Sequence, residues 1–528
     1  VFVGEVNPTI YNRYDIFVPD NSVEIYKTMW SSVADRIKPV SSKKYILELS
    51  YNDGKPGSSY LCYLSSIPIS SGDTTISGIT IGDCANLIPS SCFRDCYNVT
   101  SLNINNGITT IDDNAFYNCT GLQSVSIPSS VRFIREYAFY NDVRLESVNL
   151  ANIEVIGHYA FKGCEKLKVA NLDKAYSLGR RAFEGCTSLE TVDLTALRNT
   201  GAEVFKDCTG LQSVLLTENT KLSYGMFVKS GLKKVDIYEK VQIPEFCFAN
   251  CKDLTEVTIN NDIVQIGHGA FSECSSLEDI SFNANIEIIG EQAFYGCSSL
   301  LDIDLSHVNS IGYGVFYGCN FVCELIIPDG VEVIGGGTFG GCKNFYGEIR
   351  LPDGLQWLGP GAFEYCENFS GDIIIPQGVT SIPYGCFSNT WVGGALVLHD
   401  GVTTIGDGAF ANTGLKGELR LPKDLEVISH NVFYNCDFSG ELVLPENLYT
   451  IGDKAFAYNW RLMGVLEIPE NVISIGAGAF AQCRSLEGVI FPEGLESIRY
   501  NTDWFEDGGA FQNCFGIGRI VCKGTIPA

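Results

Sequence analysis

A phenylalanine recurs along most of this chain at a nearly constant interval, and this period restricts the possible folds more than any other feature. Every step but the last is 21 to 24 residues long, and the surrounding pattern is I-G-x-x-A-F-x-x-C-x-x-L-x-x-V-x-I-P. Such a unit buries its apolar side only by stacking on its neighbours, so the pattern predicts a solenoid. Nineteen phenylalanines mark the rungs: Phe93, Phe116, Phe139, Phe161, Phe183, Phe205, Phe227, Phe248, Phe271, Phe294, Phe316, Phe339, Phe363, Phe387, Phe410, Phe433, Phe456, Phe480 and Phe511.

The apolar positions after each phenylalanine have the spacing of a leucine-rich repeat. Leu122, Val125 and Ile127 follow Phe116 as L-x-x-V-x-I, whose last part alternates inward and outward as a short strand does. We therefore predict a leucine-rich-repeat solenoid, a curved right-handed coil with a parallel β-sheet on its concave face. Strands about 4.8 Å apart would make a rod on the order of 90 Å long. The phenylalanines should form a stacked spine, each contributing about 1.5 to 3 kcal/mol by burial.

Cysteine occupies a fixed place in this pattern. Fourteen of the 21 cysteines stand three residues after a rung phenylalanine, as Cys119 and Cys274 do. That regularity favours a column of buried free thiols over metal ligands or a disulfide framework. Neighbouring rungs are close enough for a bridge, so disulfides remain the alternative.

The whole repeat resembles the BspA-like, treponemal class of bacterial surface leucine-rich repeats, over residues from about 86 to 522. The resemblance rests on the motif IGxxAFxxCxxLxxVxIPxxV, which rungs such as 111–134 match at nearly every position. It implies an exported protein attached to the cell surface that takes part in adhesion to host proteins or to other bacteria.

Both ends depart from the repeat. Residues 1–40 contain a strand pattern and then helix-like spacing, and resemble the segment that closes such arrays at their C-terminal end. Residues 41–85 alternate apolar and polar side chains between Gly and Ser turns, which predicts a β-rich N-terminal cap. Residues 523–528 read as the truncated start of a C-terminal cap. We expect both ends of the sequence to be boundaries of a fragment excised from a longer protein.

Later rungs carry the variant F-x-G-[ED]-[IL]-x-[IL]-P, which places acidic residues in one column. This column is a candidate site for a cation or a basic partner. The alternative is a solvated sheet edge whose charge Arg350 and Arg420, two residues farther along, partly compensate. The column contains Glu324, Glu348, Asp372, Glu418 and Glu441, and is interrupted at Ala395.

The last step of the repeat contains an insertion, RYNTDWFED. It adds Tyr500, Trp504 and Phe505 to a turn that is otherwise short. Exposed aromatic side chains on an insertion are candidate anchors for a partner. They could equally fold down and shield the end of the array.

Composition and motifs argue against several classes of function. A net charge of −26 without a Lys/Arg cluster disfavours nucleic acid and anionic membranes, and no apolar run reaches the length of a membrane-spanning helix. The sequence GGGTFG at 335–340 lies on a repeat turn and opens no nucleotide-binding unit. The five histidines, His158, His268, His307, His399 and His430, are scattered rungs apart. We therefore expect no enzyme, no metal and no cofactor.

These observations lead to a functional prediction. We expect a non-catalytic, monomeric bacterial surface module that binds an extracellular protein or a glycan through the concave face. The alternative is a structural spacer that holds another domain away from the cell and has no ligand of its own. The sequence does not name the ligand.

Overall fold

The computed structural model describes residues 16–18, 37–39, 44–51, 58–63, 76–81, 87–261, 263–282, 286–501 and 508–524. The chain divides into two compact units, Val1–Leu232 (unit 1) and Lys233–Ala528 (unit 2), a division that the repeat pattern does not indicate. Every regular element within these ranges is a strand, and none is a helix. The helix-like segment expected within residues 1–40 falls outside them. There, β1 (Ile16–Val18) pairs in parallel with β2 (Ile37–Pro39).

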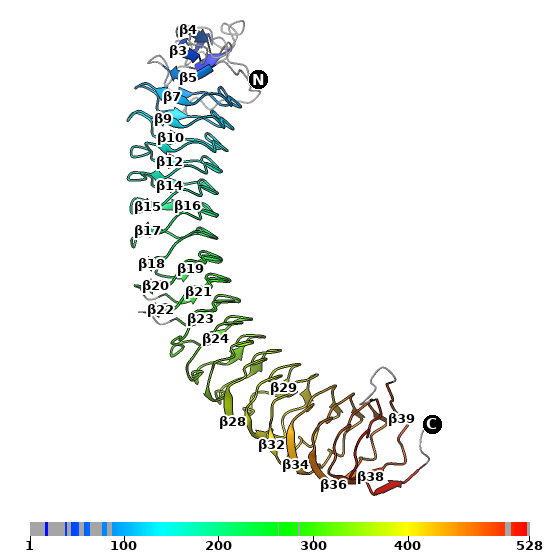
Figure 1. Ribbon diagram of the computed structural model, residues 1–528. Coiled ribbons are helices and arrows are strands. Elements are labelled where there is room, and N and C mark those ends of the chain that lie inside the picture. Colours follow the sequence, from blue (N-terminus) through cyan, green and yellow to red (C-terminus); the bar gives the residue numbers. More distant parts are fainter. Residues whose placement is uncertain are drawn as a thin grey trace. The chain divides into compact units, whose positions relative to one another are not determined.

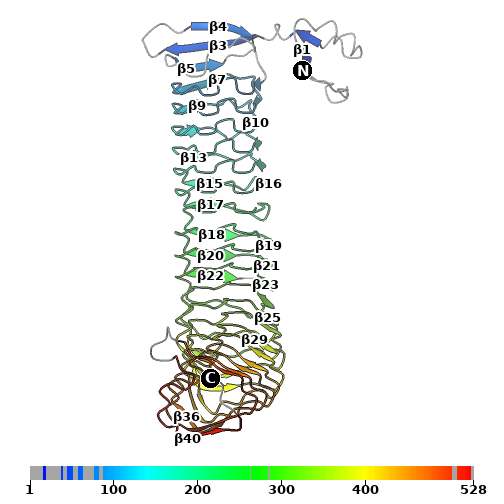
Figure 2. The same cartoon turned by 90° about the vertical axis from the view of Figure 1, so that its right-hand side faces the viewer.

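Besides the β1–β2 pair, unit 1 contains two sheets, because each rung supplies one strand to each of them. In Figure 2 the strands of the first sheet lie along one side of the unit and those of the second sheet along the other. All neighbours in both sheets run parallel except β3, which is antiparallel to β4 and β5. The first sheet comprises β4 (Ser58–Tyr63), β3 (Lys44–Tyr51), β5 (Ile76–Ile81), β7 (Ser101–Ile104), β9 (Ser124–Ser126), β11 (Ser147–Val148), β13 (Val169–Ala170), β15 (Thr191–Asp193) and β17 (Ser213–Leu215). The second comprises β6 (Leu87–Ile88), β8 (Thr110–Ile111), β10 (Phe133–Ile134), β12 (Val155–Ile156), β14 (Ser177–Leu178) and β16 (Asn199–Thr200).

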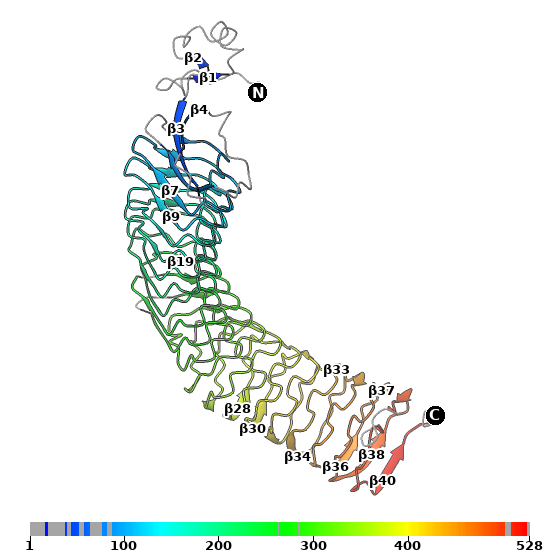
Figure 3. The same cartoon turned by 45° about the horizontal axis from the view of Figure 1, so that its top comes forward.

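Unit 2 repeats this plan with entirely parallel pairing, and Figures 1 and 3 show its rungs stacked from β18 to β40. Its first series of strands is β18 (Lys234–Ile237), β20 (Glu256–Ile259), β22 (Asp279–Phe282), β26 (Gly347–Glu348), β28 (Phe369–Ile374), β30 (Gly393–Val397), β32 (Lys416–Gly417), β34 (Asp437–Glu441), β36 (Arg461–Glu467), β38 (Leu486–Phe491) and β40 (Arg519–Cys522). Its second series is β19 (Gln242–Ile243), β21 (Gln265–Ile266), β23 (Ile288–Ile289), β24 (Ser310–Ile311), β25 (Val333–Ile334), β27 (Trp357–Leu358), β29 (Ser381–Ile382), β31 (Thr404–Ile405), β33 (Val427–Ile428), β35 (Thr450–Ile451), β37 (Ser474–Ile475) and β39 (Ser497–Ile498).

A tight turn connects the two strands around each rung phenylalanine. The residues two before and two after the phenylalanine have positive φ, as Asn114 (φ 55°) and Asn118 (φ 61°) do on either side of Phe116. Asn and Gly tolerate this left-handed region best, and they hold many of these places. This pair of left-handed residues turns the chain sharply, and the phenylalanine at the middle of the turn is buried.

The buried phenylalanines stack on one another within each unit. Ring centroids of successive rungs are 5.1 to 5.6 Å apart from Phe93 to Phe227 in unit 1. They are 5.1 to 5.8 Å apart from Phe248 to Phe511 in unit 2. Parallel rings at this distance make an apolar spine in the middle of each rung.

The cysteine column lies beside the spine, and the cysteines in it are free thiols in the structure. Their Sγ atoms donate hydrogen bonds to the carbonyl of the phenylalanine one rung earlier, as Cys297 does to Phe271 at 3.2 Å. Where cysteine is replaced, Thr390 and Asn459 donate to the equivalent carbonyls of Phe363 and Phe433. Most positions of the column thus hold a small side chain that donates a hydrogen bond to this carbonyl.

Together these features confirm the predicted fold, a parallel-strand β-solenoid of about 18 turns.

Candidate functional site

The outward positions of the first series of strands carry different chemistry in the two units. In unit 1 they are mostly hydroxyl and amide side chains, such as Ser124 and Ser126 on β9. In unit 2 several of them are acidic from β20 onward, and exposed apolar side chains join them from the rung of Phe316 onward. Since the strands are built in the same way, this change belongs to the surface and not to the fold.

The five acidic residues predicted from the sequence are all exposed on this face of unit 2; they are Glu324, Glu348, Asp372, Glu418 and Glu441, called here the acidic row. Three further acids continue the row toward β20: Glu256, Asp279 and Asp302. Of these, Glu256 and Asp279 are paired directly in register. The column predicted from the sequence did not include these three acids, because their rungs lack the F-x-G-[ED] pattern.

The acids of the later rungs do not lie directly opposite one another, in contrast to the simple column expected from the sequence. Glu348 is paired in register with Ser370, and the register then shifts at Gly371, directly before Asp372. A second shift occurs at Gly464. The offset pairing of Glu324 with Tyr346 and of Glu348 with Ser370, each two residues before the acid of the next rung, separates like charges that a regular ladder would hold face to face.

A glycine lies under the stem of each glutamate of the row, one rung farther along the chain. Gly371 has φ +83°, and a Cβ built on it would lie 2.9 Å from Cγ of Glu348 in the preceding rung. Gly464 stands in the same relation to Glu441, also at 2.9 Å. The stem of each glutamate therefore lies over a glycine, which restricts where its carboxylate can go.

Few cations neutralise the acidic row. Arg350 lies 3.0 Å from Glu348, and Arg420 lies 3.6 Å from Glu418, so the compensation expected from the sequence is present on these two rungs. Within the parts of the chain that the structure describes, Glu324, Asp372 and Glu441 form no ion pair. Oδ1 of Asp372 instead accepts a 2.7 Å hydrogen bond from the N–H of Ala395.

A row of exposed apolar side chains runs beside the acids, two residues farther along each strand. It consists of Ile326, Ile374, Val397 and Val443, called here the apolar row, and Arg350 and Arg420 occupy the same position on the intervening rungs. The exposed fraction is 75% for Ile326 and 74% for Val443. Ile374 and Val397 are paired in register, as are Arg420 and Val443. The sequence analysis did not single out this row, although the repeated [IL]-x-[IL] pattern contains it.

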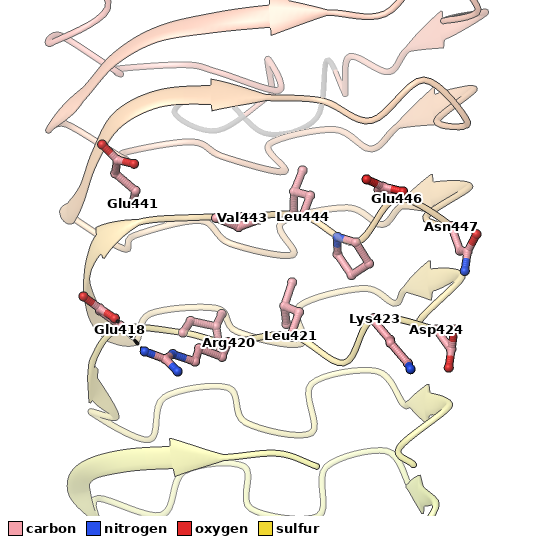
Figure 4. Close-up of a pocket in the computed structure, with 12 residues that line it drawn as sticks. Glu418, Arg420, Leu421, Lys423, Asp424, Glu441, Val443, Leu444, Glu446 and Asn447 are labelled. Atoms are coloured by element: carbon pink, nitrogen blue, oxygen red, sulfur yellow. Dashed lines mark ion pairs between the residues drawn. The ribbon is translucent and has the colours of Figure 1, made fainter. Parts of the chain in front are cut away.

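A groove of about 600 Å³ opens between two neighbouring rungs of this face. Figure 4 shows Glu418 and Glu441 at the same end of the two rungs, with Val443 following Glu441 along its strand. Leu421 and Leu444 form part of the wall, and the groove ends at a turn that carries Lys423, Asp424, Glu446 and Asn447. The groove therefore joins carboxylates, one of them paired with Arg420, to an apolar wall.

The aromatic insertion is described only in part. Tyr500 is exposed and forms an antiparallel bridge with Gly509, whereas Trp504 and Phe505 fall outside the described residues. The two interpretations of the insertion, as an anchor for a partner or as a shield for the end of the array, therefore remain predictions. Nearby, Arg484 lies over the rings of Trp460 and Phe515, at 5.7 and 5.9 Å from their centroids. This exposed stack was not anticipated from the sequence.

Two of the histidines and the glycine-rich turn have structural roles. Nδ1 of His158 accepts the N–H of Arg180 at 2.7 Å, and Nδ1 of His430 accepts the N–H of Asp453 at 2.9 Å. In the turn GGGTFG, atoms added at Gly340 would meet the Tyr317 ring at 2.9 Å. A tyrosine of the preceding rung thus covers this glycine. Among the described residues, no group of three or more His, Cys, Asp or Glu side chains could hold a metal ion.

The repeat matches a protein family along most of its length. The model of the BspA type leucine rich repeat region matches residues 86–212, 137–244, 220–346, 309–438 and 458–526. This chain belongs to the BspA-type leucine-rich repeat family. The resemblance inferred from the sequence is thereby confirmed, and proteins of this family are repeat modules that bind ligands or serve as structure.

Several solved structures are similar to the chain. A leucine-rich repeat protein from Bacteroides ovatus is 23% identical over 85% of this chain and 94% of its own, with a TM-score of 0.41. A leucine rich cell surface protein from Faecalibacterium prausnitzii is 20% identical over 87% and 93%, with a TM-score of 0.27. The pneumococcal vaccine antigen PcpA is 16% identical over 78% and 92%, with a TM-score of 0.35. No curated protein matches. Since these TM-scores are below 0.5, we base no residue assignment on them.

None of the described residues belongs to a helix long and apolar enough to cross a membrane.

Proposed function

We propose that this protein is a non-catalytic binding module of a bacterial cell surface, and that it holds an extracellular protein through the first-series strand face of unit 2. The observation that carries this proposal is the apolar row, whose side chains are exposed on one face of unit 2 from Ile326 to Val443. Exposed apolar side chains in register on one face are typical of interaction sites. Family membership supports a surface location and a role in adhesion.

The domain organisation expected from the sequence remains part of this proposal. Residues 86–522 would form the repeat array, and residues 41–85 its β-rich cap. Strands β3, β4 and β5 lie in that cap segment, and β5 pairs in parallel with β7 of the array. The sheet of the array thus continues into the segment that we assign to the cap.

The test is a binding screen of the purified protein against extracellular-matrix proteins, bacterial surface proteins and a glycan array. Two triple variants locate the site: Ile326→Ser/Ile374→Ser/Val443→Ser removes the apolar row, and Glu324→Gln/Glu348→Gln/Glu441→Gln removes charge from the acidic row. Glu332→Gln/Glu426→Gln/Glu496→Gln is the matched control, because these exposed acids lie beside the second series of strands. Saturable binding that the first two variants lose and the control retains is the expected result.

The second candidate function is a spacer without a ligand. It is favoured by unit 1, whose outward strand positions are the ordinary hydroxyl and amide side chains of a solvated sheet. A folded monomer that binds nothing in the screen would overturn the binding proposal and favour the spacer. Binding that Trp504→Ala alone abolishes would move the site to the insertion.

A further inference from the structure

We infer that the partner of this face is a cationic amphipathic helix that lies along the rungs from Glu324 to Val443. This inference rests on the proposed function and names the chemistry of its ligand. It is carried by the apolar row, the charge beside it and the pairing of the strands beneath it.

The charge of the face selects a cationic partner. Three members of the acidic row, Glu324, Asp372 and Glu441, have no ion pair among the described residues, while the two arginines of the face are already paired with Glu348 and Glu418. Opposite charges steer association and penalise partners of the wrong sign. An anionic glycan, a nucleic acid or an anionic membrane would be repelled.

The apolar row requires that the same partner also bring apolar side chains. Ile374 is 58% exposed and lies on the same strand as Asp372, and its partner Val397 on the next strand is 45% exposed. Their branched side chains offer neither the hydroxyl and amide groups nor the flat rings that suit a neutral sugar. A segment with an apolar stripe flanked by lysine or arginine would satisfy both rows.

The pairing of the strands favours a helix over an extended peptide. Strand β28 lies between β26 and β30, and β34 lies between β32 and β36, so these strands have partners on both sides. At β28 and β34 the face therefore presents side chains and no free strand edge on which a peptide could add a strand. A ligand that satisfies its own backbone hydrogen bonds is therefore required, and an α-helix does so.

The dimensions of the face agree with a helix lying across the strands. Rungs repeat every 4.8 Å or so, close to the helical pitch of about 5.4 Å. The five rung steps from Glu324 to Glu441 span about 24 Å, the length of ~16 helical residues. The two rows lie about 7 Å apart along each strand, within the width of one helix.

Two features of the face would strengthen such binding. The stems of Glu348 and Glu441 lie over Gly371 and Gly464, so these carboxylates lose little freedom when a cation arrives. The groove between Glu418 and Glu441 has an apolar wall at Leu444. It would take a lysine or arginine, whose apolar stem would lie along the wall and whose charged end would meet Glu441, since Glu418 is already paired with Arg420.

The experiment measures the fluorescence anisotropy of a labelled 18-residue peptide of Leu and Lys, arranged as an amphipathic helix, during titration with the full chain. Two peptides are controls: a scrambled peptide of the same composition without an apolar stripe, and a Leu/Glu helix. We expect the Leu/Lys helix to bind at least tenfold more tightly than either. Affinity should fall when salt rises from 50 to 300 mM, because exposed charges are screened.

The variants separate the two rows. Ile326→Ser/Ile374→Ser/Val443→Ser should weaken binding of the Leu/Lys helix at least tenfold with little change in salt dependence. Glu324→Gln/Glu348→Gln/Glu441→Gln should weaken it to a similar extent and flatten the salt dependence. The control Glu332→Gln/Glu426→Gln/Glu496→Gln should stay within twofold of the unmodified protein. Circular dichroism melts of each variant verify that it is folded.

Equal binding of the scrambled peptide, or equal loss in the control variant, would show charge attraction alone and would overturn the inference. If a ligand from the binding screen depends on the apolar row but the Leu/Lys helix neither binds nor competes, the helix inference fails while the proposed function stands. If the screen finds no ligand and the Leu/Lys helix does not bind, the proposed function and the helix inference both fail.

Discussion

The backbone N–H of Cys119 donates a 2.7 Å hydrogen bond to Oδ1 of Asp142, which stands in the cysteine column one rung farther along. Asp142 is fully buried, and its Oδ2 has no hydrogen-bond partner. Its neighbours in the column, Cys119 and Cys164, donate their S–H groups to the carbonyls of Phe93 and Phe139. A protonated Asp142 can likewise act as a donor, whereas an ionised one cannot.

Asp142 should make the stability of unit 1 depend on pH. Burial raises the pKa of this carboxyl well above its usual 3.8. Between that value and the raised pKa, the folded chain keeps a proton that the unfolded chain has lost. The contribution of Asp142 is therefore fully present below about pH 3.8 and is lost as pH rises through the folded pKa.

Substitution isolates this effect. Asp142→Asn should be more stable than the unmodified protein above neutral pH, by about 1 to 3 kcal/mol, because an amide donates without ionising. Asn459 does so at the same position of its own rung, where Nδ2 lies 2.7 Å from the carbonyl of Phe433. Thermal melts of both proteins between pH 4.5 and 8.5 measure the difference, which should grow with pH. A difference that stays constant would mean that Asp142 does not titrate in this range.

Removing one ring from the spine should destabilise unit 2. Phe294 is fully buried, 5.4 Å from the ring of Phe271 and 5.7 Å from that of Phe316. Phe294→Ala should cost about 3 to 5 kcal/mol, because it leaves a cavity between two stacked rings. Urea unfolding followed by circular dichroism checks this value. Phe515→Ala is the matched control, since that ring is 75% exposed, and it should change stability by less than about 0.5 kcal/mol.

The glycines of the acidic row should differ in their tolerance of alanine. Gly371 and Gly417 have nearly the same φ, +83° and +81°, but only Gly371 lies under a glutamate stem, that of Glu348. An added Cβ at Gly417 meets nothing within 4 Å. Gly417→Ala should therefore cost only the backbone strain of about 1 to 2 kcal/mol, and Gly371→Ala should cost more.

A double-mutant cycle tests the cause of that excess. In Glu348→Ala, the stem is absent, so Gly371→Ala should cost no more than Gly417→Ala does. Chemical unfolding of the four proteins gives the coupling energy. Independent effects of the two substitutions would show that the stem does not constrain the glycine.

The thiol column should resist alkylation in the folded protein. Burial raises the pKa of the Cys186 and Cys483 thiols well above 9.0, so the reactive thiolate is scarce at pH 8. Among the described cysteines, Cys522 should react first with iodoacetamide, because it is half-buried on the edge strand β40 and outside the column. Mass spectrometry of the labelled peptides measures the order. Column cysteines recovered as disulfides from the native protein would instead support the bridged alternative.

The repeat, the phenylalanine spine and the thiol column could all be predicted from the sequence. Their side chains point inward at a fixed period, and a residue such as Phe294 has one way to be buried when identical rungs stack. The acidic residues could also be predicted, since Glu348 and its equivalents alternate with buried strand residues.

Only the tertiary structure decided what those acids contact. The register shift at Gly371, the glutamate stem over that glycine and the groove between Glu418 and Glu441 depend on how one rung is placed on the next. The exposure of the apolar row likewise depends on what covers the strands, and in this structure nothing does at Ile326 or Val443. The repeat period and the alternation of apolar and polar residues indicate which side of a rung a residue faces. Contacts between rungs depend on backbone geometry over more than twenty residues. A local sequence pattern does not contain that information.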